Sequence, residues 1–138
     1  MTPEAIYQAL ESHLGSQLAL LNLTYLAQWE QFGGAVGAQS NPTPDQSWVR
    51  SNIQLGAVRE VELGRSGAGL RSGVLLLQIF TPKGQVRQGG ALAGTLEALL
   101  RRKNLAGVEL GEPQSRHVEN PTDNWEMHLL QVSLTAAT

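Results

Sequence analysis

The sequence predicts one α+β domain in which two helices pack on a largely antiparallel or mixed sheet of four or five strands. Apolar residues recur at helical spacing in two segments, near the N-terminus and over residues 86–103. The segments between and after them alternate with a period of two, as strands do. The chain has 138 residues and shows neither an internal repeat nor a linker-like stretch, so residues 1–138 are expected to form a single domain.

The first helix is predicted to begin at Pro3, because Thr2 is a good N-cap residue and Pro3 is tolerated at the first helical position. Gly15 is predicted to end it. One face carries residues at helical spacing, namely Ile6, Ala9, Leu10, His13 and Leu14. His13 has no partner histidine at helical spacing, so we interpret it as a core or rim residue and not as a ligand.

Extended segments follow the first helix, separated by stretches rich in glycine and proline. The segment Leu70–Thr81 is apolar on both faces, which predicts a central strand covered on both sides, or on one side by a partner chain. The other predicted parts, in order, are a strand at Leu23–Glu30, a long irregular loop at 31–46, a strand at Ser47–Leu55, extended chain at Val58–Leu63 and a turn at Gly64–Gly69.

The second helix is predicted over Val86–Lys103, with Arg101, Arg102 and Lys103 at its negative end. A short strand is expected at 108–118, interrupted at Gly111–Pro113. The chain is then predicted to turn over Glu119–Asp123 and to end in a strand at Asn124–Leu134.

Cysteine is absent, which excludes disulfides, thiolate metal sites and cysteine nucleophiles. Gly64 and Gly69 have the spacing of a phosphate-binding loop, but Leu70 stands where that motif needs lysine, and a strand follows instead of a helix. We therefore interpret this stretch as a hairpin turn and predict no nucleotide or other cofactor.

Acidic residues and two histidines gather around the last predicted turn: His117, Glu119, Asp123, Glu126 and His128. Paired strands would bring His117 close to His128, and together with carboxylates they could ligate a divalent metal. The spacing is not diagnostic, and His128 alternates with apolar residues as a core residue would. We expect no metal and no catalytic residue.

The charge is balanced overall, at a net of -2, which argues against nucleic-acid binding as the main function. It is uneven along the chain. Residues 1–49 hold four acids and no base, residues 50–103 nine bases and three acids, and residues 104–138 five acids and one base. Copies of the chain could therefore meet through opposite patches, unless folding interleaves the segments and cancels the asymmetry.

No basic signal sequence and no apolar run of membrane-spanning length occur, so a soluble protein made in a cytoplasm is expected. The three tryptophans, Trp29, Trp48 and Trp125, stand in predicted strands. Trp48 and Trp125 lie on the less apolar faces of theirs, which favours a role in contact surfaces, although core packing remains the alternative.

The pattern as a whole resembles the tail terminator family of long-tailed bacteriophages, over about residues 3–135. The features that carry the resemblance are the helix from Pro3, the strand start Trp48-Val49-Arg50, Arg71-Ser72-Gly73 before the apolar strand, Thr81-Pro82-Lys83-Gly84, the Leu92–Leu100 helix, and Asn124-Trp125 before the last strand.

The resemblance implies a structural protein of the virion tail, assembled in the host bacterial cytoplasm. Such a protein forms a sixfold ring that caps the tail tube, ends its polymerisation and offers a surface to the head–tail connector protein. Its partners would be further copies of itself, the major tail tube protein and the connector. Another head–tail joining or tail-completion protein is the first alternative, and a metal-dependent enzyme a more distant one. The expected contact residues are Trp48, Arg50, Arg65, Arg71 and Trp125, with Asp45 and Glu30 as acidic counterparts.

Overall fold

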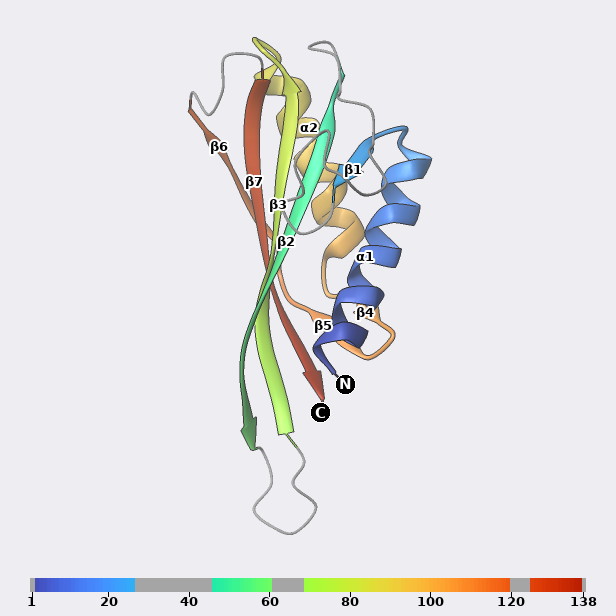
Figure 1. Ribbon diagram of the computed structural model, residues 1–138. Coiled ribbons are helices and arrows are strands. Elements are labelled where there is room, and N and C mark those ends of the chain that lie inside the picture. The colour runs from blue at the N-terminus through green and yellow to red at the C-terminus, as the bar shows by residue number, and fades with distance from the viewer. Residues whose placement is uncertain (1, 27–45, 61–68, 120–124, 138) are drawn as a thin grey trace, which may run out of the picture.

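A computed structural model describes residues 2–26, 46–60, 69–119 and 125–137 of the chain (Figure 1). Its elements, in chain order, are α1 (Pro3–Leu20), β1 (Thr24–Leu26), β2 (Trp48–Glu60), β3 (Gly69–Pro82), α2 (Val86–Leu100), β4 (Asn104–Leu105), β5 (Val108–Leu110), β6 (Gln114–Val118) and β7 (Trp125–Ala137). Neither helix is long and apolar enough to cross a membrane within this described part of the chain.

The strands form one mixed sheet, which confirms the predicted α+β class. Its order is β1-β2-β3-β7-β5-β4, and β6 pairs with β7 beside β5. β1 runs parallel to β2, and every other pair is antiparallel. The sheet has seven strands where four or five were predicted, because the two-residue β4 was not expected and the interrupted segment 108–118 forms two strands, β5 and β6.

The first helix begins as predicted and ends later. The Thr2 hydroxyl accepts a hydrogen bond from the Ala5 amide at 3.1 Å. The prediction that Gly15 ends the helix is wrong: α1 continues to Leu20. The reason is the fully buried row Ile6, Leu10, Leu14 and Leu18, which gains its last member only if the helix passes through Gly15.

The second helix ends at Leu100, three residues before the predicted end. Its buried row is Gly89, Ala93, Leu96 and Leu100. Arg102 has a φ of 52°, which no helix accommodates, and its amide donates to the Gly111 carbonyl, so the chain already turns towards β5. Both arginines of this turn bind one carboxylate, since Arg101 Nε lies 3.0 Å and Arg102 Nε 2.6 Å from Glu112.

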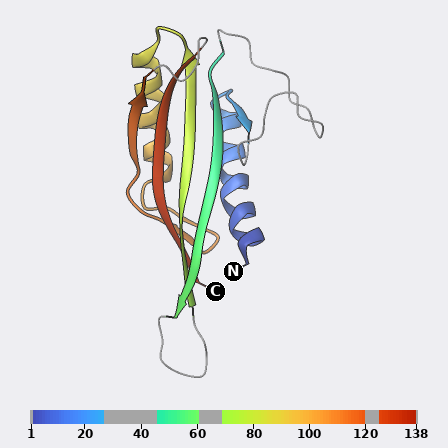
Figure 2. The ribbon, with the colours of Figure 1, turned by 60° about the vertical axis from the view of Figure 1, so that its left-hand side comes forward.

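Both helices pack on the same face of the sheet, called the inner face below (Figure 2). On β3, the inner side chains Leu75, Leu77 and Ile79 are completely buried among the helices. Val74 and Leu76 point to the opposite, outer face and are half-buried. β3 is a central strand as predicted, between β2 and β7, but within the described residues the helices cover only one of its faces.

The C-terminal strands follow the prediction closely. The interrupted segment 108–118 forms β5 and β6, and the last strand begins at Trp125 and extends to Ala137. β2 and β3 are antiparallel neighbours, as a hairpin requires. The predicted loop 31–46 apart from Gln46, the turn residues 64–68 and 120–123, and residues 27–30, the second half of the predicted first strand, lie outside the described residues.

Candidate functional site

The outer face of the sheet carries an aromatic cluster at one end. Trp48, Phe80 and Met127 are buried there, although they point away from the helices. The rings of Trp48 and Phe80 stack with centroids 4.0 Å apart and planes 9° apart. Trp125, half-buried, meets Trp48 edge-on at 5.6 Å. Trp48 is only 4% exposed, so this cluster is a second small core that the outer face builds from its own side chains.

Arg50 closes one side of this cluster. Its guanidinium carbon lies 5.9 Å from the Trp48 ring centre and 5.7 Å from that of Phe80, in cation–π range. Its Nε donates to the Gln78 side-chain oxygen at 2.8 Å, and Nη2 donates to the same oxygen. Burial lowers the pKa of Arg50 from its ordinary value, although the group stays charged. Arg50 therefore holds a positive charge in a fixed position on the outer face.

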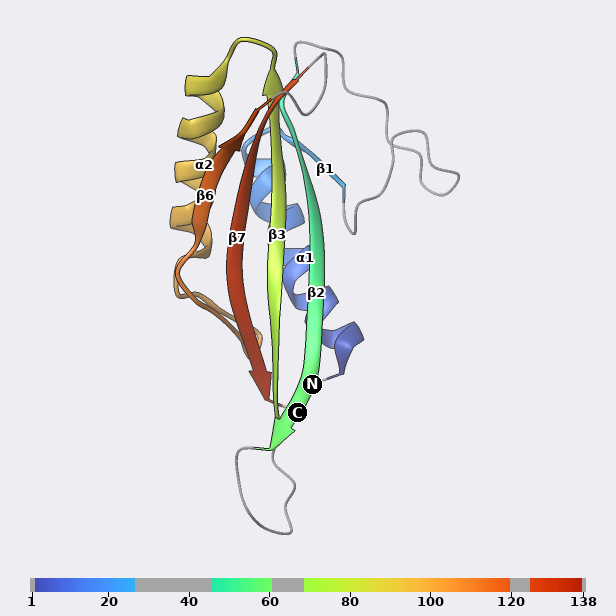
Figure 3. The same ribbon diagram turned by 90° about the vertical axis from the view of Figure 1, so that its left-hand side faces the viewer.

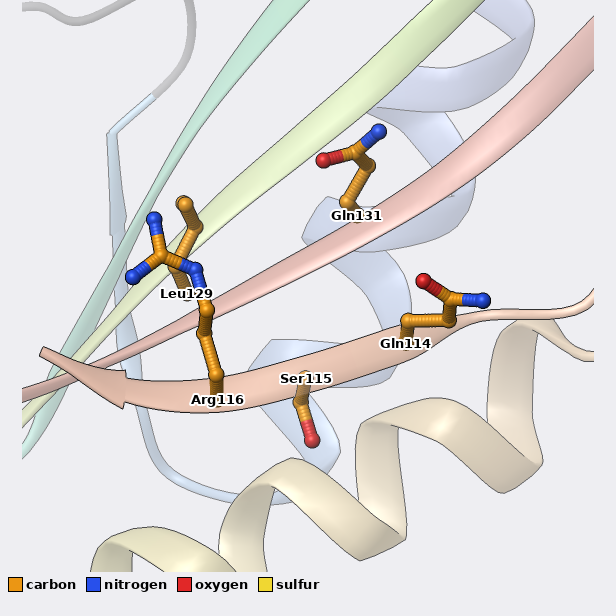
Figure 4. A pocket seen from close by; sticks show the side chains of 5 residues that line it. All are labelled: Gln114, Ser115, Arg116, Leu129 and Gln131. Atoms are coloured by element: carbon orange, nitrogen blue, oxygen red, sulfur yellow. The ribbon is translucent and has the colours of Figure 1, made fainter.

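The outer face continues along the strands as a mixture of amides and half-buried aliphatic side chains. A hollow of about 140 Å³ lies between β6 and β7, lined by Gln114, Ser115, Arg116, Leu129 and Gln131 (Figure 4). The side chains of Gln114, Arg116 and Gln131 rise on the outer side, whereas Ser115 points towards α2 and bonds Glu97. Ligand pockets typically hold 300–1,000 Å³, so this hollow suits a partner's side chain better than a whole substrate.

The predicted contact residues fall into two groups. Trp48, Arg50 and Trp125 come together at the aromatic cluster, whereas Arg71 lies near the far end of β2 and β3, where Nη1 donates to the Gly56 carbonyl at 3.1 Å. Glu30, Asp45 and Arg65 lie outside the described residues, so the predicted pairing of basic with acidic residues stays a prediction. Phe80 and Gln78, which complete the site around Trp48 and Arg50, were not predicted; the signal that identifies them is the register Trp48 to Phe80 and Arg50 to Gln78.

The histidines of the last strands lie on the inner face, beside the start of α2. His117 of β6 is paired with His128 of β7, and their ring centres are 5.1 Å apart. The Glu126 carboxylate lies 3.1 Å from His117 Nε2, accepts a hydrogen bond from the Gly84 amide at 3.2 Å, and stands 3.7 Å from Lys83 Nζ. One carboxylate thus connects β6, β7 and the turn that begins α2.

The surroundings of Glu126 and His128 shift the pKa values of both groups. The hydrogen bond with His117, followed by that from the Gly84 amide, lowers the pKa of Glu126, so the carboxylate is ionised at neutral pH. Burial, with a smaller contribution from His117, lowers the pKa of His128, and its Nδ1 has no hydrogen-bond partner. Within the described part of the chain no three histidine or carboxylate groups are placed to hold a metal ion. The geometry is that of a structural connection between strands and helix.

Comparison with known proteins identifies the fold and nothing finer. No family model and no curated protein matches the sequence. Ten chains of solved structures match. One of them superposes with a TM-score of 0.69 at 16% identity, over 100% of this chain and 96% of its own. At that identity the likeness establishes that the α+β architecture occurs elsewhere over the same full length.

Proposed function

We propose that this protein is a structural component of a bacteriophage tail, a tail terminator whose copies form a ring on the end of the tail tube. The observation that carries the proposal is the two-layer architecture: helices cover the inner face, while the outer face presents half-buried Trp125 and Arg50 and the exposed amides of Gln54 and Gln131, with the aromatic cluster packed beneath them. A sheet face of this kind suits contact with other protein chains more than it suits binding of a small substrate.

The charge distribution supports the same proposal. The basic middle of the sequence supplies β2, β3 and α2, and α1 carries Glu4 and Glu11 without any lysine or arginine. A ring requires two different patches on each copy, and separate acidic and basic regions provide such a pair. Exposed ion pairs contribute only about 0–1 kcal/mol each, so apolar contact must supply most of the affinity. We therefore expect weak association in solution, which is completed on the tube end.

The test is native mass spectrometry of the purified protein over a range of protein and salt concentrations, with and without tubes of the polymerised major tail protein. We expect a ring, sixfold by the resemblance, whose population rises at low salt or on tubes. A protein that stays monomeric at high concentration and also fails to bind tubes contradicts the proposal. Binding to the head connector alone, without binding to tubes, would instead identify a head–tail joining protein.

An enzymatic function has a separate test. Elemental analysis after mild purification is expected to find no stoichiometric metal. A metal that is retained by the wild-type protein and lost from a variant carrying both His117→Ala and His128→Ala would establish a metal site, and the structural proposal would then be wrong.

A further inference from the structure

Among the residues that the structure describes, the sheet has a strand edge without a partner on each of its two sides. β1 pairs only with Trp48–Arg50 of β2, and no strand of the described residues pairs with the remaining part of β2 on that side. On the opposite side of the sheet, β6 pairs with β7, and its second edge has no strand partner in the described part of the chain (Figure 3). Free edges present unpaired amide and carbonyl groups that can accept a further strand.

The strand directions allow these two edges to meet. β2, β3, β7 and β6 are successive neighbours, and each pair is antiparallel. β2 and β7 therefore run in one direction, and β3 and β6 in the other. A second copy in the same orientation, placed beside the first, brings its β2 next to the first copy's β6 in antiparallel order. This is the pairing that the sheet already uses between its long strands.

The register defines how far the second copy must be displaced. Arg116 lies opposite Leu129, Leu129 opposite Gln78, and Gln78 opposite Arg50. Across the sheet, β6 thus lies on the same rows as residues 48–52 of β2, and β1 already pairs with residues 48–50. A displacement of four positions, from Arg50 to Gln54, brings β6 to the free part of the edge. An even displacement also keeps inner side chains with inner ones, whereas an odd one would exchange the two faces.

The displacement of four positions agrees with the stagger between strands that a closed sheet requires. Four positions over four strands is about one residue per strand, which is the stagger of closed barrels whose strands tilt by roughly 36°. The β-bulge between Leu55 and Val58 ends the regular part of β2 on the other side. The free segment is therefore residues 51–55, limited by β1 on one side and by the bulge on the other, and four of the five residues of β6 fall opposite it while Gln114 meets the bulge.

We propose that β6 of one copy pairs antiparallel with β2 of the next, with Arg116 opposite Gln54, so that the sheets of the ring are continuous. This inference rests on the proposed ring and names the surface that closes it. In this register Val118 lies opposite Asn52 on the outer face, and no like charges face each other. The two edges differ, so the contact is heterologous, and its repetition gives a ring where the rotation closes, not a twofold dimer.

The experiment uses single cysteines, because the chain has none of its own. Gln54→Cys and Arg116→Cys are prepared as two separate proteins, both at exposed positions. Side chains directly opposite each other on paired strands have Cβ atoms about 4.5–5.5 Å apart, close to disulfide reach. Within one chain the two positions are three strand spacings apart across the sheet and four residues apart along it, roughly 20 Å in all, which is too far. Gln131→Cys is the matched control, because it is exposed on the same face but belongs to the interior strand β7.

We expect the mixture of Gln54→Cys and Arg116→Cys to oxidise to a mixed disulfide dimer under ring-forming conditions, and the Gln54→Cys with Gln131→Cys mixture not to. The double variant Q54C/R116C should give a ladder of linked species that ends at the ring size. As a second measurement, the amides of residues 51–55 that point away from β3 should exchange several-fold more slowly in the ring than in the monomer.

The outcomes separate the two proposals. If native mass spectrometry finds rings, but neither the mixed disulfide nor the slowed exchange appears, the edge pairing is wrong and the tail function stands. Disulfides only between identical positions would show a twofold contact and also overturn the edge pairing. If neither rings nor tube binding occur, both the edge pairing and the proposed function are wrong.

Discussion

Gly89 of α2 lies so close to His128 of β7 that a single substitution at this glycine tests how α2 packs on the sheet. A methyl group at this position would lie 2.5 Å from Nδ1 and 2.6 Å from Cε1 of His128, and 3.1 Å from the Thr81 hydroxyl oxygen. The His128 ring is buried between β6 and the helix, so it cannot move into solvent without uncovering the core. We therefore expect Gly89→Ala to force α2 away from the sheet.

The magnitude follows from two opposing effects. Replacing glycine by alanine within a helix contributes about 1 kcal/mol of stability. Overpacking a closely packed site removes about 1–3 kcal/mol. A methyl group added at Gly94, in the same helix, would meet nothing within 4 Å, so Gly94→Ala gains the first effect without the second. The free energy of unfolding of Gly89→Ala should then fall below that of Gly94→Ala by about 1–3 kcal/mol.

Urea denaturation of both variants, followed by far-UV circular dichroism, measures this difference directly. Adding His128→Ala to Gly89→Ala should recover part of the loss, because the ring that blocks the methyl group is gone. If Gly89→Ala is as stable as Gly94→Ala, α2 does not pack against His128 as closely as these distances indicate.

Three further predictions concern the aromatic cluster around Trp48 and the cluster of His117, Glu126 and His128. Trp48→Ala should lower the free energy of unfolding by about 3–5 kcal/mol in chemical denaturation. Trp125→Ala should lower it by clearly less, because Trp48 is buried and Trp125 only half-buried. Equal losses would show that Trp48 is not the buried centre of the aromatic cluster. The lowered pKa of His128 means that the unfolded chain takes up the proton first, so stability should fall as the pH drops below about 6.5, and His128→Gln should flatten that slope in thermal melts. The folded pKa of Glu126 is lowered, so the stability that this carboxylate contributes is complete above its unfolded pKa and is lost as the pH falls through the folded pKa. Glu126→Gln should therefore have a lower melting temperature than the wild type at neutral pH, and the difference between the two melting temperatures should disappear in acid.

The local pattern of the sequence determined the elements. Thr2 and Pro3 were enough to predict the start of α1, because capping depends on residues a few positions away. The end of α1 could not be predicted from neighbouring residues. Gly15 is a plausible stop by its own propensity, and only the sheet against which Leu18 is buried decides that the helix continues.

Which residues meet was decided by the tertiary structure. The period of two in β2 and β3 puts Trp48 and Arg50 on one face, but it does not say that Phe80 and Gln78 lie opposite them, because strand register depends on the packing of the whole sheet. His117 and Glu126 meet for the same reason, and the turn before α2 joins them only because the helix lies across that end of the sheet. Charge and periodicity are properties of neighbours along the chain. The edges of β2 and β6 that have no strand partner among the described residues exist only in the folded sheet, where the order of strands determines which backbone groups find a partner.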